Sequence, residues 1–279
     1  MSAHNITFGV QPVINEQFRR AMEPSAQKML AQKALLEQAI SRVVWQGDHS
    51  PGSIFQLRLH QNQFELESRL VRRTLEQQAT VWKDAAFDLV AKDYAESIDK
   101  LYVQVGNLAL TLLRDRETKL HLPQIKAHDQ QYKTSNDEAL LVLSGLQKLR
   151  MESIFAPVHL TSNASIDTLR NLAYAVWFTF ENIVMKKDYL PSRVLELNLL
   201  QNQFEIEAKK VRLTIQHTRA PTADAAQMAV TLYMNITNGL YDHITQKALE
   251  LFSKTNSALS FDLATLIVSR LHNMRMEVS

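Results

Sequence analysis

One segment of this chain occurs twice, and this repeat limits the possible folds more than any other feature of the sequence. Residues 57–74 recur at 197–214, a shift of 140 positions, and 11 of the 18 pairs are identical. A match of this quality indicates that one structural unit occurs twice along the chain. The identical residues of the first copy are Leu57, Leu59, Gln61, Asn62, Gln63, Phe64, Glu65, Glu67, Val71, Arg72 and Thr74.

The repeat extends beyond that window on both sides. Ser25 falls on Ser165 in the same register, and Ala109 falls on Ala248 after a slip of one residue. We therefore predict two related units joined by a linker. The expected organisation is an N-terminal arm with a short helix over 1–24, a first unit over 25–120, a linker with one helix over 121–164, a second unit over 165–258 and a C-terminal helix over 259–279.

The composition favours helices in both units. The chain has only six glycines and seven prolines, so long stretches contain no residue that interrupts a helix. The segment 47–52 predicts a turn, and a weaker break is expected near 78–80. Pro24 is expected to end a short helix before Ser25 caps the next one, and the polar run 126–135 is expected to be a linker. The predicted helices cover 13–22, 25–46, 53–117 with that break, 135–156, 165–190, 191–217, 222–257 and a last segment from 260.

Each repeat helix carries an apolar stripe whose residues recur at steps of three and four. A second apolar set lies beside the stripe, so the helix needs cover on more than one side. These patterns predict an all-α fold of long amphipathic helices in antiparallel bundles, with an internal duplication. The stripe is either the core of these bundles or a surface-binding face, and its residues are Leu57, Phe64, Val71, Leu197, Phe204 and Val211.

The polar residues around the stripe allow more than one interpretation. Phe64 and Phe204 each lie in the pentapeptide Gln-Asn-Gln-Phe-Glu. Its polar members are either solvated neighbours of a core phenylalanine or a recognition element. They could also determine how the two units pair, because a polar residue near a helix seam can set the register.

The sequence contains no motif for catalysis or cofactor binding. Cysteine is absent, and none of the nine histidines follows a glutamate at the Glu-x-x-His spacing that a di-metal helical bundle requires. His-Glu-x-x-His, Gly-x-Ser-x-Gly and glycine-rich phosphate loops are also missing. His60 is matched by Leu200 in the second copy, which favours a packing role for this histidine. We predict a protein that is not an enzyme and has no metal or cofactor.

Charge limits the classes of partner. The net charge is +2, from 31 basic and 29 acidic residues, so nucleic acid is not an expected partner. The tryptophans lie in apolar helix patterns rather than in basic runs, so we assign them to the core or to an apolar contact surface. These residues are Trp45, Trp82 and Trp177.

A basic cluster on the repeat helices has two interpretations. It could bind phosphates or an anionic lipid surface, or it could be a solvated helix face that nearby glutamates balance. Its residues are Arg69, Arg72, Arg73, Lys209, Lys210 and Arg212. No apolar run is long enough to span a membrane. The lack of cysteine and of a leader-like N-terminus favours the cytoplasm.

The second copy resembles a known family. The run Leu195-Glu196-Leu197-Asn198-Leu199 opens a long amphipathic helix, a break follows at Ala220-Pro221, and a second helix closes with Lys247-Ala248-Leu249-Glu250-Leu251-Phe252-Ser253-Lys254-Thr255. This arrangement resembles the phasins, bacterial proteins that coat polyhydroxyalkanoate storage granules, over about 190–257 and more weakly over 53–117.

The resemblance implies a non-catalytic, all-helical protein that binds the hydrophobic polyester surface of a granule in the cytoplasm. It also implies self-association or contact with other granule proteins, and the present chain would carry two tandem phasin-like units. The main alternative is a helical scaffold or adaptor that binds another protein through its apolar stripe. A membrane-surface module that uses the basic cluster is a third reading, and an enzyme built from distant polar residues is the last.

Overall fold

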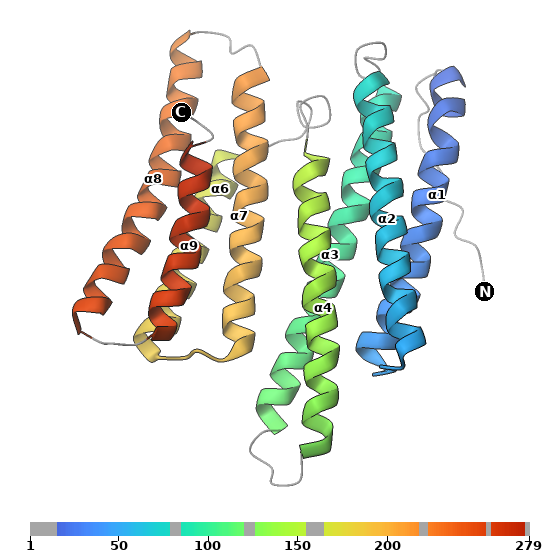
Figure 1. Cartoon of the computed structure of the whole chain (residues 1–279). Helices are drawn as coiled ribbons and strands as arrows, with labels where there is room; N and C mark the ends of the chain where they lie inside the picture. The colour runs from blue at the N-terminus through green and yellow to red at the C-terminus, as the bar shows by residue number, and fades with distance from the viewer. Residues whose placement is uncertain are drawn as a thin grey trace.

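The computed structural model describes residues 16–78, 85–119, 126–154, 165–217, 223–254 and 258–276. Over these residues every regular element is a helix, which confirms the predicted all-α class. Figure 1 shows the helices packed lengthwise against one another, with α3 behind α4 and α6 behind α9 and α7. The elements are α1 (Glu16–Ile40), the π-helical turn η1 (Ser41–Trp45), α2 (Pro51–Gln78), α3 (Ala85–Lys119), α4 (Lys126–Ser153), α6 (Ile166–Lys186), α7 (Pro191–His217), α8 (Ala223–Lys254) and α9 (Ala258–Met276).

The buried apolar residues form two cores. The first core lies among α1, η1, α2, α3 and α4, and the second among α6, α7, α8 and α9. Helix α1 packs along α2 and α3 along α4, while α6 packs along α7 and α8 along α9. The same order of helix pairs therefore recurs in the two halves of the chain.

The fourth helix of each half also has a sequence counterpart in the other half. Ser135-Asn-Asp-Glu-Ala matches Ser260-Phe-Asp-Leu-Ala, a shift of 125 positions, and the match continues to Arg150-Met and Arg275-Met. The packing agrees with this register. Gly145 of α4 faces Glu65 of α2, and its counterpart Arg270 pairs with Glu205 of α7 at 2.7 Å. Helix α4, which was expected to lie in a linker, thus packs in the first half as α9 does in the second.

Two local expectations were wrong. Pro24 lies inside α1 rather than ending a helix, so Ser25 caps nothing. The proline removes one backbone hydrogen bond, and the buried contacts of Met29 and Leu36 along the same helix outweigh that loss. Helix α4 begins at Lys126, so the run expected to be a linker is helical from there on.

Tertiary contact explains the early start of α4. Ser135 is buried and its hydroxyl lies 2.9 Å from Nε2 of His49, in the turn before α2. Because its hydroxyl is held by His49, Ser135 does not bond to the backbone N–H groups of the next turn, as it would if it capped a helix that started there. Other local signals were read correctly: Ser165 caps α6 by accepting a hydrogen bond from the Thr168 N–H at 3.3 Å.

The turn between η1 and α2 is held by one carboxylate. Gly47 adopts a positive φ of 70°, which glycine accepts without strain. Asp48 then accepts hydrogen bonds from the Ser53 hydroxyl at 2.7 Å and the Ser50 N–H at 3.2 Å, and its carboxylate lies 3.1 Å from Arg42. The bonds from Ser53 and Ser50 lower the pKa of Asp48 to about 2.

Replacing Asp48 should remove a pH-dependent part of the stability. Because the pKa is lowered on folding, the ionised carboxylate stabilises the protein above the unfolded value of about 4, and this contribution is lost as the pH falls towards about 2. We expect Asp48→Asn to lower the midpoint of thermal unfolding at pH 6, with the difference from the parent shrinking towards pH 2. A constant difference across this range would contradict the assignment.

The two repeat phenylalanines should matter equally for stability. Phe64 and Phe204 are fully buried, one in each core, whereas Phe55 on α2 is 67% exposed. Phe64→Ala and Phe204→Ala should each lower the free energy of unfolding by about 3–5 kcal/mol. Phe55→Ala is the matched control and should change it by about 0.5 kcal/mol or less in dilute protein. Denaturant titration measures these values, and equal losses at all three positions would refute the placement.

Candidate functional surfaces

All six residues of the predicted stripe lie in the interior. Leu57, Phe64 and Val71 belong to the first core. Leu197, Phe204 and Val211 belong to the second, and none of the six is more than 2% exposed. In this conformation the stripe is therefore packed against neighbouring helices, and candidate surfaces for binding must be sought elsewhere.

The two copies of Gln-Asn-Gln-Phe-Glu have different surroundings. The first glutamine is buried in both copies, as Gln61 and Gln201. Asn62 is exposed on α2, whereas its counterpart Asn202 donates a hydrogen bond to the Tyr102 hydroxyl of α3 at 2.6 Å. The polar residues of the second copy thus join the two halves of the molecule, and we call this contact of α7 with α3 and α4 the joint.

Arg150 is the centre of the joint. Its side chain is only 2% exposed, and its Nε donates to the Asp99 carboxylate at 2.8 Å. The same guanidinium donates to Gln203 of α7 at 2.7 Å and lies 4.1 Å from the ring centroid of Tyr102. One cation from α4 therefore links α3, α4 and α7, and the paired carboxylate limits the cost of burying the charge.

Tyr102 is held in its neutral form at the joint. Burial raises the pKa of the Tyr102 hydroxyl, which the hydrogen bond from Asn202 and the charge of Arg150 oppose less strongly. A neutral phenol can accept from Asn202 without placing a buried negative charge at the contact. This part of the joint is therefore polar, and the buried cation of Arg150 is paired with a carboxylate.

Apolar contacts complete the joint. Leu195 of α7 belongs to the first core, although the rest of the α7 stripe packs in the second. Leu199 lies so close to α3 that a Cβ at Gly106 would be 3.3 Å from its Cδ2 atom. Glycine at this position therefore allows the close approach of the two helices.

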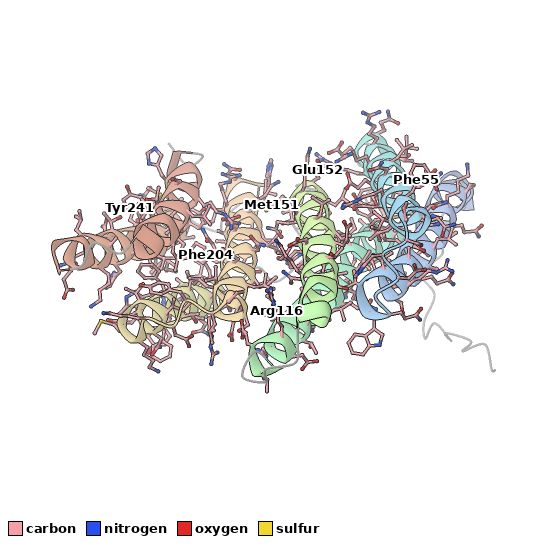
Figure 2. All side chains as sticks on the ribbon, turned by 60° about the horizontal axis from the view of Figure 1, so that its bottom comes forward. Phe55, Arg116, Met151, Glu152, Phe204 and Tyr241 are labelled. Atoms are coloured by element: carbon pink, nitrogen blue, oxygen red, sulfur yellow. The ribbon has the colours of Figure 1, made fainter. Side chains whose placement is uncertain are left out.

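Most of the described members of the basic cluster are paired. Arg69 contacts Glu152 of α4 at 2.9 Å, and its counterpart Lys209 donates to the Met151 carbonyl at 2.6 Å. These equivalent side chains hold one end of α4 from α2 and from α7, and Figure 2 shows Met151 and Glu152 at that end. Arg72 pairs with Glu76 at 2.8 Å. This pattern fits the charge-balanced helix face.

The described residues provide no metal site. His60 is half-buried on α2, and no cluster of three His, Asp or Glu side chains suitable for a metal occurs among the described ranges. Within those ranges no helix is both long and apolar enough to cross a membrane.

Two apolar grooves lie at equivalent places in the two halves. The first, of about 340 Å³, runs between α1 and α3 and is lined by Ile40, Leu101 and the 61%-exposed Trp45. The second, of about 280 Å³, runs between α6 and α8 and is lined by Leu240, the counterpart of Leu101, and by Trp177. Both grooves are therefore formed by the first and third helices of their half.

The second groove carries an aromatic cluster. Tyr174 and Phe178 are 59% and 51% exposed, and their rings stack with centroids 5.9 Å apart. Trp177 meets Tyr174 edge-on at 5.6 Å and His243 of α8 at 5.7 Å. A rigid aromatic rim around an apolar floor is the composition found at protein-binding hot spots.

Sequence reasoning assigned the tryptophans to a core or contact surface without locating the grooves. Trp45 and Trp177 line grooves, and Trp82 lies outside the described residues. The signal in the sequence that would have located the second groove is the width of the apolar face of α6, which is wider than the face that packs in the second core. Its core face includes Val176 and Phe180, so the neighbouring aromatics at 174, 177 and 178 widen the apolar face beyond it.

Comparison with known proteins supplies no relative: no family model, no curated protein and no solved structure matches this chain.

Removing the cation at the centre of the joint should weaken the fold. Arg150→Met keeps much of the side-chain volume but leaves Asp99 and Gln203 without their partner, so the free energy of unfolding should fall by about 1–3 kcal/mol. Lys148→Met changes an exposed cation on the same helix and should have an effect of about 0.5 kcal/mol or less. Denaturant titration compares the two variants, and equal effects would show that Arg150 does not organise the joint.

Proposed function

We propose that this protein is a non-catalytic helical scaffold that binds apolar helices of partner proteins in its two grooves. The observation that carries this proposal is the pair of exposed aromatic side chains, Tyr174 and Phe178, that stack beside the α6–α8 groove next to the half-buried Trp177. An amphipathic helix in an apolar groove is a common mode of peptide recognition, and it requires no reacting group.

Trp177 packs against the second core, but the exposed Tyr174 and Phe178 are not explained by the packing of their own half. Five of the six buried positions of α6 have apolar counterparts on α1 and η1, as in Leu36 and Val176, and the sixth, Ala173, corresponds to Lys33. In contrast, the exposed Tyr174 and Phe178 correspond to the small Ala34 and the polar Gln38 of α1. Since the first half forms its core without these aromatics, their presence in the second half supports a role in binding.

Binding to a polyhydroxyalkanoate granule remains a second proposal, supported by another observation. Trp45 and its counterpart Met185 are 61% and 60% exposed, so both halves present a large apolar side chain at the same position. Such side chains could meet an extended polyester surface, with a binding strength that scales with the buried apolar area. In that case the protein would be a cytoplasmic, phasin-like coat that acts through exposed residues, or through the stripe after the bundles open.

One pair of variants tests both proposals. The variant Tyr174→Asp with Phe178→Asp should fold, because both side chains are exposed, and it should lose groove binding. Leu30→Asp is the matched control, since Leu30 is 50% exposed on α1 and lines neither groove. A photo-crosslinking residue at position 235, an exposed position that lines the α6–α8 groove, would be used to capture partners in the producing cells. Co-sedimentation with polyhydroxybutyrate particles would measure polymer binding.

The outcomes separate the two proposals. A discrete crosslinked protein that is lost in the groove variant but not in the control would support the scaffold. An amphipathic peptide copied from the sequence of that protein should compete with it for the groove. Sedimentation with polymer particles that survives in the control would support the granule coat. Neither crosslink nor sedimentation would reject both proposals. Loss of a defined chemical activity on changing a single histidine or carboxylate would reject the non-catalytic role.

A further inference from the structure

The face that α7 buries in the joint has an exposed counterpart on α2. Leu195, which packs in the first core, is 7% exposed, and Ile206, about three turns further along the same side of α7, is 2% exposed. The residues at the same repeat positions on α2 are Phe55 and Leu66, which are 67% and 57% exposed. The two helices orient their stripes towards their cores in the same way, so these positions form the same face in both halves.

The match includes the residues that give the joint its geometry. Leu199 lies against Gly106 of α3, beside Leu143 of α4. Its counterpart on α2 is Leu59, which is 41% exposed. Asn202 and Gln203, which bond to α3 and α4, correspond to identical residues at 62 and 63, and these are exposed. Helix α2 therefore presents a joint-forming face with no occupant among the described residues.

The opposite side of the joint also has an exposed counterpart. The α3–α4 surface that receives Leu199 corresponds to α8–α9, where a shallow hollow of about 180 Å³ is lined by Thr245, Leu249, Thr265 and Val268. Thr245 stands at the position of Gly106, and the smaller Val268 stands at the position of Leu143. Tyr102, which accepts from Asn202, is matched by Tyr241.

An ion pair of the joint is replaced by neutral residues on both of the exposed counterpart faces. Arg114 of α3 forms an ion pair with Glu196 of α7 at 3.4 Å in the joint. The counterpart of Glu196 on α2 is Gln56, and the counterpart of Arg114 on α8 is Ser253. Both charges are replaced together by neutral residues, so contact between the two exposed faces would bury no unpaired charge at this position.

We propose that copies of this protein associate head to tail, with the α2 face of one copy seated on the α8–α9 hollow of the next. The intermolecular contact uses the same pair of faces as the joint that connects the two halves of one chain, with Thr245 in place of Gly106 and the smaller Val268 in place of Leu143. Figure 2 shows that Phe55 of α2 and Tyr241 of α8 lie towards opposite sides of the molecule. Two different surfaces form the contact, so the association extends into chains unless the rotation between copies closes a ring. This inference does not depend on binding in the grooves.

Single substitutions on either face should abolish growth of the assembly. Leu59→Glu places a charge on the α2 face, and Thr265→Glu fills the exposed hollow with a charge of the same sign, so the two altered surfaces cannot attract each other. Both positions are exposed, so circular dichroism should show the parental helix content. Each change should weaken self-association by about tenfold or more. Leu30→Glu changes an equally exposed leucine outside both faces and should behave as the parent.

Mixing the two variants tests the direction of the contact. Light scattering of the parent should give a mass that rises with concentration above the 31.9 kDa of one chain. Each variant alone should be a monomer at concentrations where the parent associates. The mixture should form a 1:1 dimer and nothing larger, because one intact α2 face meets one intact hollow.

Three results would overturn the proposal. The parent could remain a monomer at every concentration reached, in which case the two faces do not bind each other. Leu59→Glu or Thr265→Glu could associate as strongly as the parent, which would place the contact elsewhere. The two variants could fail to combine although each prevents association, which would show that the α2 face of one copy does not seat on the hollow of another.

Discussion

The arrangement of this molecule depends on one helix that is covered on two sides. Helix α7 places Phe204 in the second core and Leu195 in the first, so the same element belongs to both bundles. An ordinary amphipathic surface helix has one apolar stripe and one solvated face. Because α7 buries both sides, neither half can move away from the other without exposing apolar surface, and the two halves act as one body through this helix.

The polar part of the joint determines its register rather than its strength. Apolar contacts such as Leu199 against α3 tolerate small sliding movements, whereas hydrogen bonds and a buried cation require particular partners. Arg150 meets Asp99, Gln203 and the ring of Tyr102 at the same time. A shift of α7 by one turn would separate Gln203 from this guanidinium and leave buried polar groups unsatisfied, which is costly. The polar motif therefore excludes neighbouring registers.

The sequence was most informative where a few adjacent residues decide the structure. Helix α7 opens at Pro191 and α6 begins next to Ser165, both as predicted, because each signal acts within one helical turn. Prediction failed where distant contacts decide: α4 starts at Lys126, and Ser135 meets a turn 86 residues away in sequence. The stripe residues could be identified from periodicity, yet periodicity alone did not distinguish a core from a binding face. The grooves were missed because they require knowledge of which helices become neighbours.

The repeat is more informative once its two copies are compared in place. Residues that form a core must match in both halves, and Phe64 with Phe204 meets this requirement. Asn62 and Gln63 have no such reason to match, since they are exposed on α2 while their counterparts bond across the joint. Packing within the first half leaves their identity unexplained. A second use of the joint-forming face, between copies instead of within one chain, accounts for their identity and for the exposed leucines beside them through a single physical cause.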